Sequence, residues 1–137
     1  MTDLLSMTKP ELEALMQQLG EKRFAASQLF SWLHKQRVTS FDEMTNLSKA
    51  LREKLKKNYN ISTCTIAKKL VSVYDETVKY LFTLPDGEQI ESVVMKYKYG
   101  YTICVSSQVG CKMGCTFCAS TIAGFRRNIL PSEMLSE

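Results

Sequence analysis

Three cysteines within eight residues, Cys111, Cys115 and Cys118, constrain this chain more than any other feature of its sequence. Their x3 and x2 spacing allows three thiolates from a single loop to converge on one small inorganic centre. Cysteine thiolates hold iron–sulfur clusters, and most four-iron clusters use four of them. A site with only three cysteine ligands would leave one iron without a protein ligand. The spacing therefore favours a four-iron cluster that has room for a further, chelating ligand.

S-adenosylmethionine is such a ligand, because its amino and carboxylate groups chelate an open iron. Three other interpretations stay open. A structural zinc site needs four closed ligands, usually arranged in pairs, and the single histidine, His34, lies in a distant helical region. Buried structural thiols suit one cysteine better than three in a loop that contains glycine. Disulfides are disfavoured by the odd total of five cysteines. Phe117 precedes the last cysteine, and its ring is expected to shield the cluster from water.

The composition is that of an ordinary globular protein, with 45% hydrophobic and 23% charged residues in 137. That length suffices for one modest domain or two small ones. The net charge of +4 is compatible with an anionic partner such as RNA without requiring one. No stretch approaches the roughly 20 apolar residues of a membrane helix, and the N-terminus does not resemble a signal peptide. We expect a cytoplasmic protein with reduced thiols.

Residues 1–60 are predicted to form a helical domain. A first helix starts at Thr8, with proline in its first turn and Glu11 three residues after the cap, and ends at Gly20. A second helix is expected over residues 25–34, with Phe24 on its apolar side, and a third over residues 48–58. The third helix carries a basic outer face, which is interpreted as solvated rather than as an RNA contact. Its cations are Lys49, Arg52, Lys54, Lys56 and Lys57.

Residues 61–100 are predicted to form a small antiparallel β meander. Strands are expected over residues 77–84 and 90–97, joined by a turn at Pro85-Asp86-Gly87. Residues 101–106 are interpreted as a short buried strand that leads into the cysteine loop, and a further helix should start at Pro131. The expected class is α+β, with a helical part that precedes a sheet.

The string from Cys104 through Ser106, Ser107 and Gln108 to Cys118 resembles one branch of the radical S-adenosylmethionine superfamily. That branch is the RlmN/Cfr family of dual-specificity RNA methyltransferases. Further matches lie at residues 26–33, 44–49 and 124–128, so the resemblance spans essentially the whole chain. It implies that residues 101–137 are the first strand and cluster loop of an incomplete α/β barrel of the TIM type.

The resemblance also implies a chemistry. Family members methylate C2 of adenosine in 23S rRNA and in tRNA, by a ping-pong route through a methylcysteine. The implied cofactors are a [4Fe–4S] cluster held by the three clustered cysteines, with Phe117 beside it, and S-adenosylmethionine. Cys104 matches the cysteine that resolves the protein–RNA adduct, and Glu91 matches the proton acceptor. Without the resemblance, Cys104 would be interpreted as a buried strand cysteine and Glu91 as an outward-facing glutamate.

The partners implied are RNA and an electron donor such as flavodoxin or ferredoxin, for a monomer without a membrane association. Family members are more than twice as long, and their methyl-carrying cysteine has no counterpart here, so these residues alone should be inactive. Two other functions stay open, a radical enzyme with another substrate and a non-catalytic RNA-binding module with a structural metal. Cys64 and Trp32 are expected to be structural, whereas Arg126 and Arg127 are expected to meet phosphate or solvent.

Overall fold

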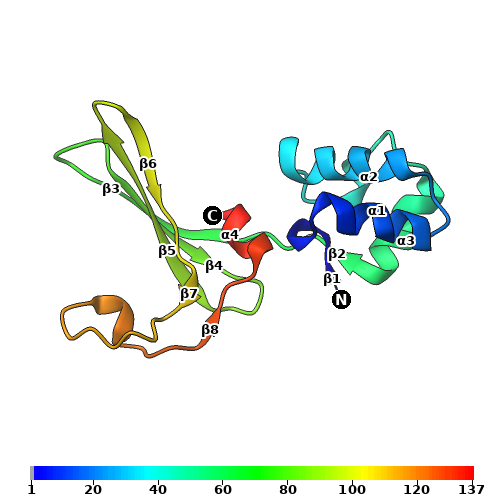
Figure 1. Ribbon diagram of the computed structural model, residues 1–137. Coiled ribbons are helices and arrows are strands. Elements are labelled where there is room, and N and C mark those ends of the chain that lie inside the picture. Colours follow the sequence, from blue (N-terminus) through cyan, green and yellow to red (C-terminus); the bar gives the residue numbers. More distant parts are fainter. Residues whose placement is uncertain (1) are drawn as a thin grey trace. The chain divides into compact units, whose positions relative to one another are not determined.

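The computed structural model describes residues 2–137 and divides into two compact units, between Ser62 and Thr63 (Figure 1). The boundary expected near residue 60 lies close to this division. The further boundary expected at residue 100 stays a prediction, because residues 63–137 form one unit. No helix in the described part of the chain is long and apolar enough to cross a membrane.

The first unit is mainly helical, and its helices are those predicted. The capping box at the start of α1 is present, since the Thr8 backbone N–H donates to the Glu11 carboxylate at 2.6 Å. The second predicted helix is α2 followed by one π-helical turn, and Ser48 caps the third. The elements are β1 (Thr2–Asp3), a 3₁₀ turn (Leu4–Ser6), α1 (Lys9–Gln18), α2 (Arg23–Phe30), the π turn (Ser31–Lys35), a 3₁₀ turn (Phe41–Glu43), α3 (Lys49–Asn58) and β2 (Tyr59–Asn60).

A continuous core of leucine and methionine side chains fills the first unit. Trp32 packs against this core, as expected, and its indole N–H donates to the Asn46 side chain at 2.5 Å. The position predicted for Phe24 is wrong, because its side chain is 59% exposed. The buried stripe of α2 runs through Ala25, Ala26 and Leu29, and the helical period turns Phe24 away from it.

Most cations on the outer face of α3 are engaged within the first unit. Lys56 pairs with Asp42 at 2.6 Å, and Arg52 donates to the Asp42 carbonyl at 2.9 Å. Lys54 lies 3.6 Å from the Glu21 carboxylate. These contacts agree with the interpretation of a solvated face, because three of the five cations already have partners.

The second unit is built on one antiparallel sheet with the strand order β3-β4-β5-β6. Its strands are β3 (Thr65–Val71), β4 (Val78–Thr83), β5 (Gln89–Tyr97) and β6 (Gly100–Cys104). The predicted turn at Pro85-Asp86-Gly87 joins β4 to β5, and Gly87 adopts a φ of 88° there. The mixed helix-and-sheet class is therefore confirmed, whereas the start of a barrel stays a prediction.

The strand β6 is not buried, so that expectation is wrong. Tyr101 and Ile103 are 67% and 62% exposed, and Cys104 is exposed as well. The reason is position, since β6 is an edge strand that pairs with β5 on one side and has no second neighbour among residues 2–137.

A second small core joins the sheet to the segment that follows it. After β6 come β7 (Gln108–Val109), the cysteine loop, β8 (Arg127–Asn128) and α4 (Pro131–Ser136), as Figure 1 shows. The strands β7 and β8 pair antiparallel. Val109 and Ile129 bring this segment against the sheet and pack with Phe82, Leu84 and Ile90.

Candidate metal and catalytic site

The two-stranded pair β7–β8 closes the loop that carries the three cysteines. Gly110 lies at the entrance of this loop with a φ of 73°, which favours glycine. A Cβ on Gly110 would stand 1.7 Å from the carbonyl oxygen of Gly124, at the other side of the entrance. The loop can therefore close in this way only when position 110 has no side chain.

Hydrogen bonds within the loop shape the path of its three cysteines. The Cys118 N–H donates to the Cys115 carbonyl at 3.1 Å. The Thr121 hydroxyl lies 3.0 Å from the Cys115 carbonyl and 2.8 Å from the Cys118 carbonyl. The Met113 N–H donates to the Cys111 sulfur at 3.4 Å, the kind of contact that tunes a thiolate ligand. The loop thus orders the cysteine backbone through its own polar groups.

The three sulfurs themselves do not form a finished metal site. Cys111, Cys115 and Cys118 are half-buried free thiols. Within residues 2–137, no three His, Cys, Asp or Glu side chains stand close enough together to hold a metal ion. The donor set still fits an iron–sulfur cluster, because it offers three unpaired thiols from one loop. Ligation would require the sulfurs to converge, so the metal assignment stays a prediction.

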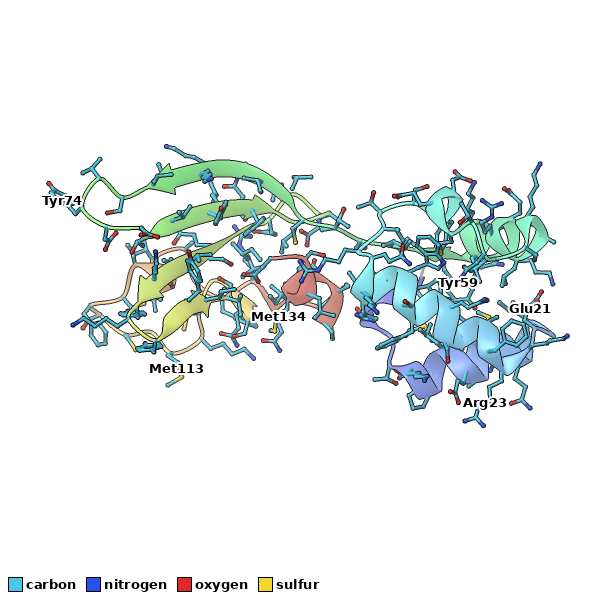
Figure 2. The ribbon with its side chains drawn as sticks, turned by 90° about the horizontal axis from the view of Figure 1, so that it is seen from above. Glu21, Arg23, Tyr59, Tyr74, Met113 and Met134 are labelled. Carbon is cyan, nitrogen blue, oxygen red and sulfur yellow. The ribbon has the colours of Figure 1, made fainter. Side chains whose placement is uncertain are left out.

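The apolar side chains of the loop point outward. Phe117 is 91% exposed, so its ring does not cover the cysteines, and the shielding role expected for it stays a prediction. Met113 is 78% exposed and lies at the surface of the loop in Figure 2. The Lys112 ammonium stands 4.3 Å from the centre of the Phe125 ring, a distance at which cation–π attraction is effective.

The register of the sheet brings the other two candidate residues to the same face. Cys104 on β6 lies directly opposite Val93 on β5. Side chains alternate along a strand, so Glu91, two residues from Val93, faces the same side as Cys104. Such diagonal neighbours lie about 7–8 Å apart between their Cα atoms. Both side chains are exposed, which agrees with the outward-facing interpretation of Glu91 and contradicts the buried interpretation of Cys104.

Lys79 belongs to the same face, although the sequence analysis did not identify it. It lies opposite Val93 on β4, and its ammonium pairs with the Glu91 carboxylate at 2.8 Å. The Ser106 hydroxyl donates to the Glu91 carbonyl at 2.7 Å and fixes the backbone there. The alternation of residues 78–83 indicates which side of β4 carries Lys79. That Lys79 lies beside Glu91 could be predicted only with the register between β4 and β5.

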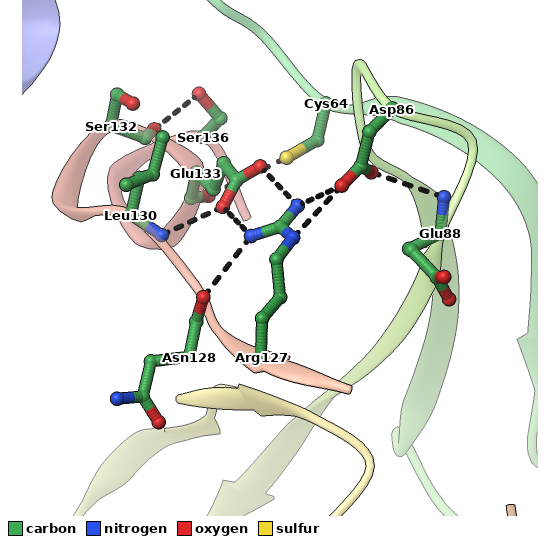
Figure 3. Close-up of polar contacts among 9 residues, drawn as sticks. All are labelled: Cys64, Asp86, Glu88, Arg127, Asn128, Leu130, Ser132, Glu133 and Ser136. Atoms are coloured by element: carbon green, nitrogen blue, oxygen red, sulfur yellow. Dashed lines mark hydrogen bonds and ion pairs between the residues drawn. The ribbon is translucent and has the colours of Figure 1, made fainter. Parts of the chain in front are cut away.

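A second polar cluster, also missed from the sequence, ties the end of the cysteine loop to α4 (Figure 3). The Arg127 guanidinium donates to both oxygens of Glu133 at 2.8 Å and pairs with Asp86 at 2.6 Å. Glu133 is only 3% exposed. The hydrogen bonds from Arg127 lower the pKa of the Glu133 carboxyl below its usual value. Arg127 therefore has a structural role in this cluster, while its side chain stays 31% exposed to solvent, and the contact with phosphate stays a prediction.

Cys64 lies beside this cluster and has the structural character expected of it. Its thiol donates to the Glu133 carbonyl at 3.5 Å, and its side chain packs against the small core of the second unit. Burial raises the pKa of Cys64 to about 11, and the negative charges of Glu133 and Glu137 add to that rise. The thiol is therefore protonated and unreactive near neutral pH.

The polar residues before the first cysteine satisfy protein groups. The Ser106 N–H donates to the Glu137 carboxylate at 3.0 Å, and the Ser92 hydroxyl contacts the same oxygen. The Gln108 side chain donates to Asn128 across the β7–β8 pair at 3.0 Å. The side chains of Ser106 and Gln108 thus satisfy polar groups of the protein itself, as the side chains of loop residues often do.

Comparison with known proteins identifies relatives of this chain. Residues 2–61 match the family described as the ribosomal RNA large subunit methyltransferase N-terminal domain. A "probable dual-specificity RNA methyltransferase RlmN" of Alkaliphilus oremlandii is 53% identical over 135 residues, which are 98% of this chain and 39% of that protein. The protein of the same description from Clostridium novyi is 48% identical and matches over all of this chain and 40% of its own length.

The fold has a counterpart among solved structures. The crystal structure of a radical SAM methyltransferase from Sphaerobacter thermophilus superposes with a TM-score of 0.85 at 38% identity, over 98% of this chain and 39% of that one. The chain thus spans about two fifths of the length of the curated relatives it matches. Over these residues the chain belongs to the RlmN family, within the radical SAM methyltransferases.

Proposed function

We propose that the protein containing these residues methylates C2 of adenosine in 23S rRNA and in tRNA. Membership of the RlmN family and a loop with three free thiols support this proposal. Cys111, Cys115 and Cys118 would hold a [4Fe–4S] cluster and leave one iron open for S-adenosylmethionine. When bound, that cluster supplies the one-electron reduction of S-adenosylmethionine, which C2 needs because it is not nucleophilic enough for an ordinary methyl transfer.

The observation that carries the proposal to this chain is the shared face of Glu91 and Cys104. Because both side chains are exposed on one side of β5 and β6, a single RNA adduct can meet both. Cys104 would resolve the protein–RNA adduct, which forms through a methylcysteine supplied outside these residues in a ping-pong sequence. Glu91 would take the proton, for which a carboxylate is a suitable base, and Lys79 would hold the carboxylate in place until substrate arrives.

The proposed partners follow from the same chemistry. RNA is the substrate, and a small electron carrier such as flavodoxin or ferredoxin supplies the electron. We propose a monomer that acts in the cytoplasm, where reducing conditions keep five free cysteines as thiols.

Metal loading tests the first half of this proposal. The chain should bind four irons with sulfide under anaerobic reconstitution, and S-adenosylmethionine should alter the electron paramagnetic resonance spectrum of the reduced cluster through the open iron. Cys64→Ala provides the control, because Cys64 lies outside the loop and should not affect loading. One zinc without iron would support a structural metal in an RNA-binding module and would overturn the proposal.

Cys104→Ala tests the second half. We would introduce it into a chimaera in which these residues replace the matching segment of the Alkaliphilus oremlandii relative. Iron loading should stay unchanged, whereas methylated adenosine, measured by mass spectrometry of digested RNA, should become undetectable. Loss of iron from this variant would make Cys104 structural. Unchanged methylation would remove it from the reaction, and a chimaera that modifies another substrate would leave only the superfamily assignment.

A further inference from the structure

The β5–β6 hairpin carries an aromatic surface that the proposed reaction does not use. Tyr97 ends β5, and Tyr99 lies in the two-residue turn before β6. Their rings are parallel within 9°, with centroids 5.2 Å apart, although both are solvent-exposed, at 46% and 80%. Tyr101, the second residue of β6, is 67% exposed as well. Exposed tyrosines with a fixed, parallel arrangement offer a flat apolar face to a planar ligand.

The charge around this hairpin favours an anionic ligand. From Ser92 to Ser132 the sequence contains no acidic residue, whereas it contains five basic ones. Lys96 is paired with Glu76 of the neighbouring turn at 2.7 Å, so its charge is partly neutralised. Lys98 lies between the two stacked tyrosines in sequence and forms no ion pair within the described part of the chain. The tyrosine pair thus has a free cation next to it.

The tyrosine pair lies close to the face of the sheet that carries Glu91 and Cys104. Side chains alternate along β5, so Tyr97 faces the same side as Glu91, and its hydroxyl contacts the sulfur of Met95, also on that side, at 3.5 Å. Val93, opposite Cys104, is four residues from Tyr97 along the strand. At the rise of a β-strand this separation is about 13 Å. A polymer that reaches Cys104 can therefore also reach the tyrosine pair.

We propose that Tyr97 and Tyr99 form a stacking platform for an unpaired base of the RNA, with Lys98 beside the adjoining phosphate. Aromatic side chains stack on the bases of single-stranded RNA, whereas in a duplex neighbouring base pairs cover the base faces. The inference rests on the proposed function, because that function identifies the anionic polymer as RNA. It adds a binding site outside the reaction centre, on the same face of the sheet.

Binding of a fluorescein-labelled, single-stranded oligoadenylate to this chain, followed by anisotropy, tests the platform. The double substitution Tyr97→Ala and Tyr99→Ala should weaken binding roughly 5- to 150-fold, the range expected for the loss of stacking on one base. The double change to phenylalanine keeps both rings and should retain affinity. Lys98→Ala should reduce the slope of log affinity against log salt by about 0.7, as expected for one phosphate contact on a single strand.

Tyr74→Ala is the matched control, because Tyr74 is 95% exposed at the tip of the β3–β4 hairpin (Figure 2) and lacks a stacked ring among the described residues. It should not change affinity. Equal affinities of the double alanine variant and this control, or no binding of oligoadenylate by the unaltered chain, would overturn the platform. Iron loading of the same proteins is a separate measurement, so a failed platform with normal loading leaves the proposed function intact. Absent loading together with tyrosine-dependent binding of oligoadenylate would reject the methyltransferase and leave an RNA-binding surface.

Discussion

Gly110→Ala is expected to destabilise the second unit by about 3 kcal/mol or more and to abolish iron loading. A left-handed backbone costs a residue with a Cβ about 1–2 kcal/mol. The new methyl group would also overlap the backbone oxygen of Gly124, at 1.7 Å, and forced overpacking adds about 1–3 kcal/mol. A backbone atom cannot turn aside as a flexible side chain does, so the entrance of the cysteine loop must open.

Gly114→Ala separates the overlap from the backbone strain. Gly114 lies between Cys111 and Cys115 with a φ of 66°, and a Cβ there would meet nothing within 4 Å. Its loss of stability should stay near the 1–2 kcal/mol of the strain alone. Urea unfolding followed by circular dichroism would measure both variants. Hydrogen exchange of the Arg126 and Ile129 amides, which donate to the Val109 and Ser107 carbonyls at 2.9 and 3.1 Å, would report the closure of the loop. Trp32 fluorescence reports the first unit and should not change. Equal effects of the two alanines would contradict the close approach at Gly110.

Arg127→Met is expected to destabilise the second unit by about 3–5 kcal/mol at pH 7, because removal of one partner leaves a buried charge uncompensated. The Glu133 side chain is 4% exposed and loses both of its hydrogen bonds from the guanidinium. Arg127→Lys keeps a positive charge but not the planar fork, so its effect should be intermediate. Adding Glu133→Gln to Arg127→Met should recover part of the loss, and urea unfolding would measure all three.

The same pair gives a pH dependence with a defined sign. The folded-state pKa of Glu133 lies below the value of 4.5 that it has without a partner. The stabilisation is therefore fully present above pH 4.5 and is lost as the pH falls through the lowered folded-state value. The stability difference between the unaltered chain and Arg127→Met should then be largest near neutral pH and shrink in acid. A difference that does not vary with pH would contradict the ion pair.

The helices could be predicted because their signals are local. Thr8 and Glu11 define a start by themselves, and the spacing of Leu12, Leu15 and Met16 defines the buried side of the helix without knowledge of any other segment. The strands over residues 77–84 and 90–97 and the turn at Gly87 were equally visible, whereas the short strands β7 and β8 were not predicted. The predictions of burial at Phe24 and along residues 101–106 were wrong. Burial depends on which other segment of the chain packs against a helix or strand, and local spacing does not contain that information.

The candidate site was only partly predictable for the same reason. The cysteine spacing identifies the loop, and the resemblance identifies Cys104 and Glu91. The pairing of Lys79 with Glu91 depends on strand register, and that of Arg127 with Glu133 joins a short strand to the helix after it. Neither contact follows from periodicity. The adjacent arginines in residues 126–127 look alike in the sequence, yet among the described residues only Arg127 is held in an ion pair.

The unequal cores of the two units have a consequence for how strongly a bound inorganic group would stabilise residues 63–137. The cysteine-bearing unit has only five buried apolar residues in its core among residues 63–137, and a small core gives little stability of its own. A tightly held inorganic group adds stability in proportion to the logarithm of its supply. The iron-loaded form of residues 63–137 should therefore unfold at a higher urea concentration than the iron-free form, and the midpoint difference would measure how tightly the loop holds the inorganic group.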